Sequence, residues 1–68
     1  SAADDEKTTE ILEFCRTPRS KKELAEFLEI KSVTYGIKRY VEPLVENGLL
    51  ALSEPKNPGS RSQKYYTV

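Results

Sequence analysis

Side chains that commonly catalyse reactions or bind metal ions are scarce in this 68-residue chain, which has no histidine and one cysteine, Cys15. A single copy can therefore form neither a disulfide nor a histidine–cysteine zinc site. Cys15 follows Phe14 in a helical apolar pattern, which predicts a small buried hydrophobe and not a reactive thiol. The sequence contains no glycine-rich phosphate loop. We expect no catalytic residue, no metal and no cofactor, and predict that the chain is not an enzyme.

Basic residues are the remaining candidates for chemistry, because they can neutralise phosphate groups. The net charge of the chain is zero, but its charges are unevenly distributed. Five acidic residues and one lysine give residues 1–15 a net charge of −4, whereas ten basic and six acidic residues give residues 16–68 a net charge of +4. The second part is therefore predicted to have a mildly positive surface, which permits contact with nucleic acid.

The acidic start of the chain is predicted to lie outside the folded domain. We expect residues 1–6 to be a disordered lead-in or the remnant of a tag, and residues 7–68 to form one domain cut from a longer protein. Apolar spacing predicts a first helix over residues 8–16, with Thr8 or Thr9 as its cap and a proline shortly after it.

Two further helices follow in quick succession. Ser20 and Glu23 form a capping-box pattern, which opens a second helix over residues 21–28. Ser32 can cap a third helix that runs to about Asn47, with Gly48 placed where a left-handed residue would end it. Two helices joined by so few residues form a helix-turn-helix.

The last third of the chain has the composition of strands. Residues 49–53 are apolar, and residues 63–68 are rich in tyrosine, threonine and valine. A loop rich in turn-forming residues separates them, and residues 16–19 could add a short third strand. The expected fold class is therefore α+β and mainly helical: a winged helix-turn-helix with three helices and an antiparallel β-wing of two or three strands.

Three groups of residues are together typical of one family. They are Ile30-Lys31-Ser32; Arg39-Tyr40-Val41-Glu42-Pro43-Leu44 with Gly48-Leu49; and Pro55 and Pro58 with Arg61-Ser62-Gln63-Lys64-Tyr65. Residues 11–68, which contain them, resemble the C-terminal winged-helix domain of Fic-like proteins and of bacterial regulators described as RecG-related ATP-dependent helicases. The resemblance implies a DNA-binding module at the end of a bacterial regulator of transcription. It also implies that a Fic domain or a Schlafen-type AlbA domain precedes it and holds any ATPase or nucleotidyl-transfer chemistry.

Three residues depart from what the resemblance or helix geometry would suggest. Glu29 stands in the turn where glycine is common, so the turn must avoid a left-handed conformation or accept strain. Gly36 replaces an expected bulky residue early in the third helix, which costs roughly 1 kcal/mol relative to alanine. Pro43 removes a hydrogen bond inside that helix, and we expect a kink or an irregular turn there.

The candidate DNA contacts lie on the two elements that a winged helix presents to DNA, namely the third helix and the wing. Six belong to the start of the third helix and three to the wing: Lys31, Ser32, Thr34, Tyr35, Lys38 and Arg39, then Lys56, Arg61 and Lys64. Lys38 is the strongest candidate on the helix. Arg61 is the strongest on the wing, because it follows the breaker residues near the tip and can reach phosphate or the minor groove.

The orientation of the third helix decides which of these side chains face outward. One core face consists of Val33, Ile37, Tyr40, Val41 and Leu44. That face leaves Tyr35, Lys38, Arg39 and Glu42 outward. In the usual helix-turn-helix phase, Tyr35 instead turns inward and Arg39 moves to the flank. Lys38 is exposed in both cases.

The expected partners are double-stranded DNA, bound weakly by the isolated domain, and the remaining domains of the parent protein. Glu42 and Glu46 weaken the DNA interpretation because they would face phosphates. The alternative is a protein-interaction or dimerisation module that regulates an attached Fic or ATPase domain without binding DNA. A homodimer is expected if the parent regulates transcription. No membrane contact is expected, and the predicted location is the cytoplasm.

Overall fold

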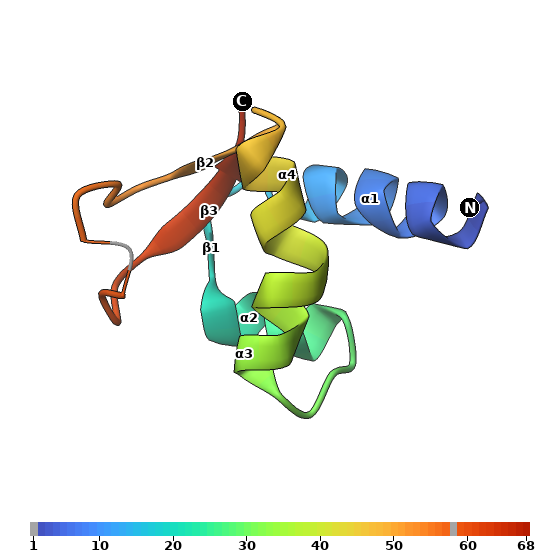
Figure 1. Cartoon of the computed structure of the whole chain (residues 1–68), viewed down its shortest axis with the longest axis horizontal. Helices are drawn as coiled ribbons and strands as arrows, with labels where there is room; N and C mark the ends of the chain where they lie inside the picture. The colour runs from blue at the N-terminus through green and yellow to red at the C-terminus, as the bar shows by residue number, and fades with distance from the viewer. Residues whose placement is uncertain (1, 58) are drawn as a thin grey trace.

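A computed structural model describes residues 2–57 and 59–68. Its elements in chain order are α1 (Ala2–Phe14), β1 (Arg19–Ser20), α2 (Lys21–Phe27), α3 (Val33–Gly36), η1 (Ile37–Val41), α4 (Glu42–Glu46), β2 (Leu50–Leu52) and β3 (Lys64–Thr67). The segments α3, η1 and α4 follow one another without a break and form the third helix (Figure 1). Three helices and a small antiparallel sheet confirm the predicted α+β, mainly helical, winged-helix-like class.

The first helix starts earlier than its sequence suggested. Residues 2–6, for which we expected disorder, form the first turns of α1, so the predicted cap at Thr8 or Thr9 is wrong. The hydroxyl of Thr9 donates to the carbonyl oxygen of Asp5 at 3.0 Å, a bond that a threonine inside a helix can make. Acidic residues near a helix start also interact favourably with the helix dipole. The domain boundary at residue 7 stays a prediction.

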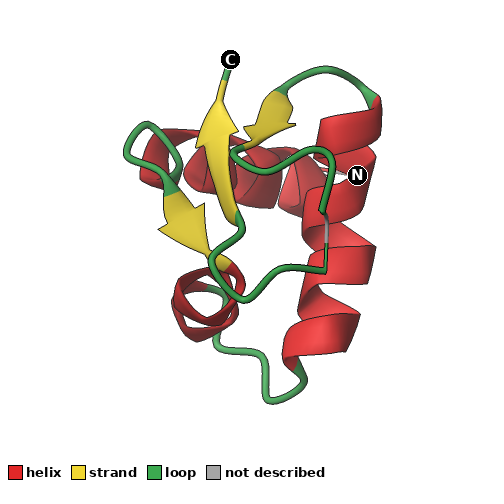
Figure 2. Cartoon of the chain, turned by 90° about the vertical axis from the view of Figure 1, so that its left-hand side faces the viewer, coloured by secondary structure: helices red, strands yellow, loops and turns green. Residues whose placement is uncertain are grey.

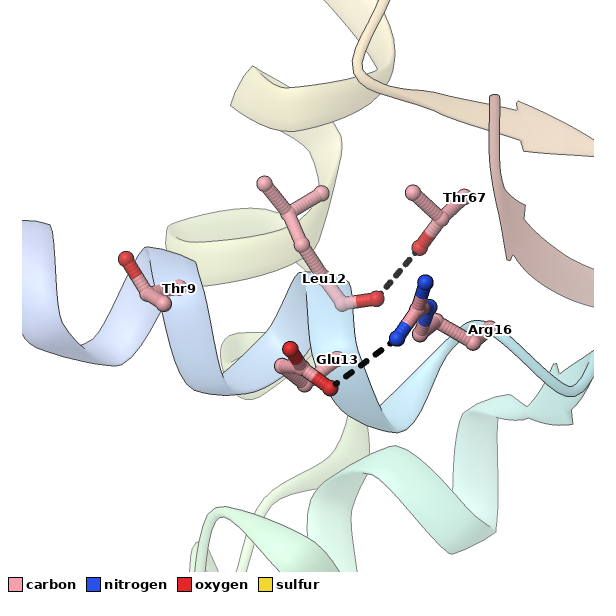
Figure 3. A pocket seen from close by; sticks show the side chains of 5 residues that line it. All are labelled: Thr9, Leu12, Glu13, Arg16 and Thr67. Atoms are coloured by element: carbon pink, nitrogen blue, oxygen red, sulfur yellow. Dashed lines mark hydrogen bonds and ion pairs between the residues drawn. The ribbon is translucent and has the colours of Figure 1, made fainter.

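The end of α1 is held by residues far away in the sequence. The last carbonyl groups of a helix have no partner within it. Thr67 supplies two partners. Its backbone N–H donates to the backbone carbonyl of Cys15 at 2.9 Å. Its hydroxyl donates to the backbone carbonyl of Leu12 at 2.5 Å (Figure 3). Arg19 supplies a third, from Nε to the carbonyl of Phe14 at 2.9 Å. The C-terminal strand and β1 therefore fix the direction in which α1 leaves the sheet.

The second helix confirms the predicted capping box. The Ser20 hydroxyl accepts from the Glu23 backbone N–H at 3.1 Å, and the Glu23 carboxylate accepts from the Ser20 N–H at 2.9 Å. The bond from the Ser20 backbone is the main reason why the pKa of Glu23 is lowered. The helix ends at Phe27, one residue earlier than predicted, with Leu28 as its C-cap.

The turn after α2 accepts strain. Glu29 has a φ of 57°, in the left-handed region that favours glycine. The N–H of Ile30 donates to the carbonyl of Ala25 and that of Glu29 to Glu26, the hydrogen-bond pattern of a Schellman cap. The third helix ends in the same motif, with Gly48 at a φ of 76° in the equivalent position, as predicted.

The turns at Glu29 and Gly48 have the same left-handed backbone conformation but different residues, so the effects of substitutions at these two positions on stability can be compared. Glu29→Gly is expected to raise the free energy of unfolding by about 0.5 kcal/mol, because relief of left-handed strain exceeds the added entropy of the unfolded chain. Gly48→Ala is expected to lower it by about 1 kcal/mol through backbone strain alone, since a Cβ at Gly48 would meet nothing within 4 Å. Urea denaturation measures both. A stabilising Gly48→Ala would contradict this explanation.

The third helix is irregular one turn before Pro43, where η1 is a π-helical turn in which the Glu42 N–H donates to the Ile37 carbonyl. Proline lacks an N–H, and its ring crowds the carbonyl four residues earlier, so a wider turn at this place accommodates it. The irregularity predicted at Pro43 therefore lies in the preceding segment. The predicted cap is confirmed, since the Ser32 hydroxyl accepts from the Tyr35 N–H at 3.2 Å.

The sheet has the strand order β1-β3-β2 and is antiparallel throughout (Figure 2). Arg19 pairs with Tyr65 across β1 and β3, and Leu50 pairs with Thr67 across β2 and β3. The short strand suggested by residues 16–19 is thus present as β1. The loop between β2 and β3 is the wing, and it projects from the sheet on the side opposite the N-terminal end of α1 (Figure 1).

One core joins all three helices to the sheet. Its buried members are Ile11, Cys15, Leu24, Leu28, Ile37, Val41, Leu44, Leu50 and Tyr65. Val33 was predicted to belong to this core, but it is 37% exposed. The side chain of Ile30 packs against the core where Val33 was expected. A Cβ at position 36 would lie 3.3 Å from Ile30 Cδ1, so glycine at this position makes room for the Ile30 side chain. This contact explains the missing bulky residue at position 36.

Candidate nucleic-acid interface

The exposed face of the third helix carries the predicted contact residues. Lys31, Ser32, Thr34, Tyr35, Lys38 and Arg39 are all exposed. Tyr35 is 56% exposed, so it does not turn inward. Ile37, Val41 and Leu44 are buried on the opposite side, and Tyr40 packs partly against them. Of the two phases considered, the structure therefore has the one that leaves Tyr35, Lys38 and Arg39 outward.

Arg39 is also engaged with its neighbours. Its guanidinium carbon lies 5.1 Å from the centre of the Tyr40 ring, and the Lys7 Nζ lies 5.2 Å from the same ring. A cation over an aromatic face is attracted by the ring quadrupole. Tyr40 thus links the first helix to the flank of the third, and Arg39 is less available to DNA than Lys38.

The wing is organised by one buried amide. Gln63 is 1% exposed. Its Oε1 accepts from the Glu54 N–H at 2.7 Å and the Ser53 hydroxyl at 3.3 Å, and its Nε2 donates to the carbonyls of Glu54 at 2.7 Å and Asn57 at 3.4 Å. The Ser62 hydroxyl closes the loop further by donating to the Glu54 carboxylate. The wing is therefore a defined scaffold for its cations.

Sequence reasoning missed the role of Gln63, although one signal was available. Side chains alternate between the two faces of a strand. Gln63, Tyr65 and Thr67 are two residues apart, and all three are buried or half-buried. This alternation places Gln63 on the inward face just before β3.

The wing cations point to solvent. Lys56, Arg61 and Lys64 are exposed, as predicted. Lys56 and Arg61 lie in the loop, and Lys64 begins β3. Pro58, one of the residues behind the resemblance, lies outside the described residues. The wing thus offers three positive charges next to the single carboxylate of Glu54.

Between the third helix and the sheet lies a hollow of about 280 Å³. Its lining residues are Lys21, Ile37, Glu42, Val45, Glu46, Leu52 and Tyr65. Burial raises the pKa of Tyr65, and the negative charge of Glu42 raises it further. Glu42 and Glu46 are exposed here. They therefore interrupt the positive charge between the helix and the wing.

Lys21 is a further residue that the sequence analysis did not select. It lines this hollow and an adjoining one of about 170 Å³, which Thr34 and Lys38 also line. Lys21 is the first residue of α2, and the two hollows place it beside the third helix and the sheet. A lysine at the start of the first helix of a helix-turn-helix is a signal that could have been used, since that helix crosses the DNA backbone.

Cys15 has no exposed surface. Burial raises the pKa of its thiol to about 11, and the charge of Arg19 only partly opposes this. Because the thiolate is the reactive form, Cys15 is an inert core residue, as predicted. Among residues 2–57 and 59–68, no group of three acidic, cysteine or histidine side chains could hold a metal ion.

The fold and this surface define a small winged-helix-like domain. A family model described as the C-terminal domain of Filamentation induced by cAMP protein Fic-like matches residues 6–67, and the chain belongs to this family. It is therefore a domain of a larger protein, and the resemblance to Fic-like proteins is confirmed. No curated protein and no solved structure matches the chain. None of the helices in the described part of the chain is long and apolar enough to span a membrane.

Proposed function

We propose that this domain binds double-stranded DNA as the C-terminal module of a larger bacterial regulator. In this proposal the third helix enters the major groove and the wing contacts the sugar-phosphate backbone. The observation that carries it is that cations are exposed on both elements: Lys31, Lys38 and Arg39 on the helix side, and Lys56, Arg61 and Lys64 on the wing.

The first turns of the third helix have side chains suited to a groove. Thr34 and Tyr35 are exposed there and can contact base edges or thymine methyl groups. Ser32 keeps its hydroxyl proton available for a phosphate oxygen while the hydroxyl oxygen caps the helix. Lys38 lies about one turn further on and supplies positive charge. These residues support a mode in which only the N-terminal half of the helix contacts DNA.

Binding by the isolated domain is expected to be weak. Glu42 and Glu46 line the hollow between the third helix and the sheet, where a phosphate backbone would pass in this proposal. Each phosphate neutralised by a cation contributes to affinity through counterion release, and carboxylates nearby reduce that contribution.

The rest of the proposal concerns the parent protein. We propose that it acts in the bacterial cytoplasm as a transcriptional regulator or a RecG-related, helicase-like ATPase. Its Fic domain or Schlafen-type AlbA domain would carry any enzymatic chemistry, and this domain would carry none. Other domains of the parent are its further partners, and a homodimer would let two copies engage paired half-sites.

The test is a fluorescence anisotropy titration of mixed-sequence duplex DNA at low and moderate salt. We expect weak binding that decreases as salt increases. Lys38→Glu and Arg61→Glu are each expected to reduce it below detection. Arg16→Glu is the matched control, because Arg16 makes an exposed ion pair with Glu13 and lies beside Thr67, at the end of β3 that the wing does not join.

The alternative function is binding to protein alone, and the interruption of positive charge by Glu42 and Glu46 favours it. The same titration separates the two. If the wild-type chain fails to bind at low salt, or if both substitutions bind as well as Arg16→Glu, DNA binding by this domain is wrong.

A further inference from the structure

An aromatic stack is exposed where α1 meets α2. The rings of Phe14 and Phe27 are parallel to within 6°, with centroids 4.2 Å apart. The Arg19 guanidinium carbon lies 4.1 Å from the Phe14 centroid, so it covers the other face of that ring. Phe27 is the outer member of the stack and is 38% exposed. Apolar aromatic surface is thus presented to solvent at the C-terminal ends of α1 and α2.

The surface beside this stack is acidic and shallowly hollowed. A hollow of about 390 Å³ is lined by Thr9, Glu10, Glu13, Phe14 and Phe27. A second one, of about 380 Å³, is lined by Asp5, Glu6, Thr9 and Glu10. Because the two share Thr9 and Glu10, they adjoin along α1. Together they form a strip with an apolar end and carboxylates along its length, which we call the α1 groove.

The charge of the α1 groove indicates what could occupy it. Four acidic residues and one lysine give residues 5–13 a net charge of −3. A second copy of the chain would bring two such surfaces together, and like charges repel. DNA and anionic lipid are disfavoured for the same reason. A basic polypeptide has the complementary charge.

The spacing of the carboxylates indicates the shape of the partner. Glu6, Glu10 and Glu13 are four and three residues apart on α1, so three carboxylates recur along the helix at about the period of one turn. A neighbouring helix can present lysines or arginines at the same period. Exposed aromatic side chains next to a hollow commonly anchor one large apolar residue of a partner.

We propose that the α1 groove docks a basic amphipathic helix of a partner protein. One large apolar side chain of that helix packs against Phe27 in the hollow, and its basic residues face Glu10 and Glu13. This contact uses residues distinct from those of the DNA interface: α1 and Phe27, the last residue of α2, form it, whereas Lys21 at the other end of α2 lines the hollows beside the third helix. One domain can then hold DNA on one side and a protein on the other.

The probe is a fluorescein-labelled synthetic peptide of leucine and lysine that forms an amphipathic helix, titrated with the 68-residue chain and followed by anisotropy. We expect saturable binding. Phe27→Ser, and separately the double variant Glu10→Lys/Glu13→Lys, are each expected to weaken it at least tenfold. Tyr66→Ser is the matched control, since Tyr66 is 37% exposed on the sheet, nearly as much as Phe27. Its peptide affinity should equal that of the wild type.

Three outcomes would overturn the proposal. The first is that the peptide shows no saturable binding. The second is that Tyr66→Ser weakens binding as much as Phe27→Ser does. The third is that a peptide of the same composition without an apolar face, or vesicles containing anionic lipid, bind as tightly as the amphipathic peptide. Circular dichroism checks the fold of each variant, and Phe27→Leu, which keeps an apolar side chain, should retain most of the affinity.

Discussion

Replacing Gln63 by leucine is expected to lower the free energy of unfolding by about 2 kcal/mol and to loosen the wing. Leucine has a similar size and fits a buried position, so the cost is not a cavity. It arises because the amide of Gln63 makes four hydrogen bonds, two of them to the backbone of Glu54 at 2.7 Å. Leucine would leave the Glu54 N–H without its partner, whereas the Glu54 carbonyl would keep its bond from the Asn57 N–H at 3.0 Å. A buried unsatisfied group costs about 1–3 kcal/mol.

A loss of this size is large for so small a domain, whose total stability is on the order of 3–10 kcal/mol. Urea denaturation measures the global effect, and hydrogen exchange at the Glu54 amide measures the local one. Ser62→Ala is the matched control, because it removes only the exposed hydrogen bonds that the Ser62 hydroxyl makes with Glu54 and Ser60 in the same loop. It should cost less than about 1 kcal/mol. If Gln63→Leu costs no more than Ser62→Ala, the buried amide does not organise the wing.

The comparison of sequence and structure explains why Gln63 was not found in advance. The capping box of Ser20 and Glu23 was predictable, because its two hydrogen bonds join residues three apart and need no knowledge of the rest of the fold. The amide of Gln63 instead bonds to residues six to ten positions away, around a loop. That path depends on how the wing closes, which local propensity does not determine.

The two Schellman caps show a similar limit. Gly48 was recognised, because glycine prefers the left-handed conformation that ends a helix. Glu29 adopts the same conformation, but glutamate carries no preference for it. Its geometry follows from the packing of Ile30 against Gly36, which ties the turn to the third helix. A tertiary contact determines the backbone conformation of Glu29, so this conformation cannot be predicted from the residue type at that position.

The candidate interface also has features that the sequence could predict and features that it could not. Periodicity was sufficient to predict that Ile37, Val41 and Leu44 are buried and that Lys38 is exposed. It could not choose between the two phases for Tyr35. It also could not show that Glu42 and Glu46 share a hollow with Tyr65 of the sheet, because β3 reaches them only through the chain topology. The order of charges along a helix was predictable, and their position relative to the wing was not.

That position leads to the second large effect. The double variant Glu42→Gln/Glu46→Gln is expected to bind duplex DNA about tenfold more tightly than the wild type at low salt. Two unit charges about 8 Å apart repel by about 0.5 kcal/mol in water and about 2 kcal/mol at an effective dielectric constant of 20. Removing two carboxylates from beside a phosphate backbone therefore gains roughly 1–2 kcal/mol in total, and 1.4 kcal/mol is a factor of ten.

The gain should decrease as salt increases, because the Debye length falls to about 8 Å at physiological ionic strength. The matched control is Glu10→Gln/Glu13→Gln, which makes the same change in net charge on α1, away from the wing (Figure 1). At physiological ionic strength its DNA affinity should differ from that of the wild type by less than about twofold, since exposed charges more than about a Debye length from the DNA are largely screened there. Equal gains from both double variants would mean that net charge alone drives binding, and that the surface between the third helix and the wing does not contact DNA.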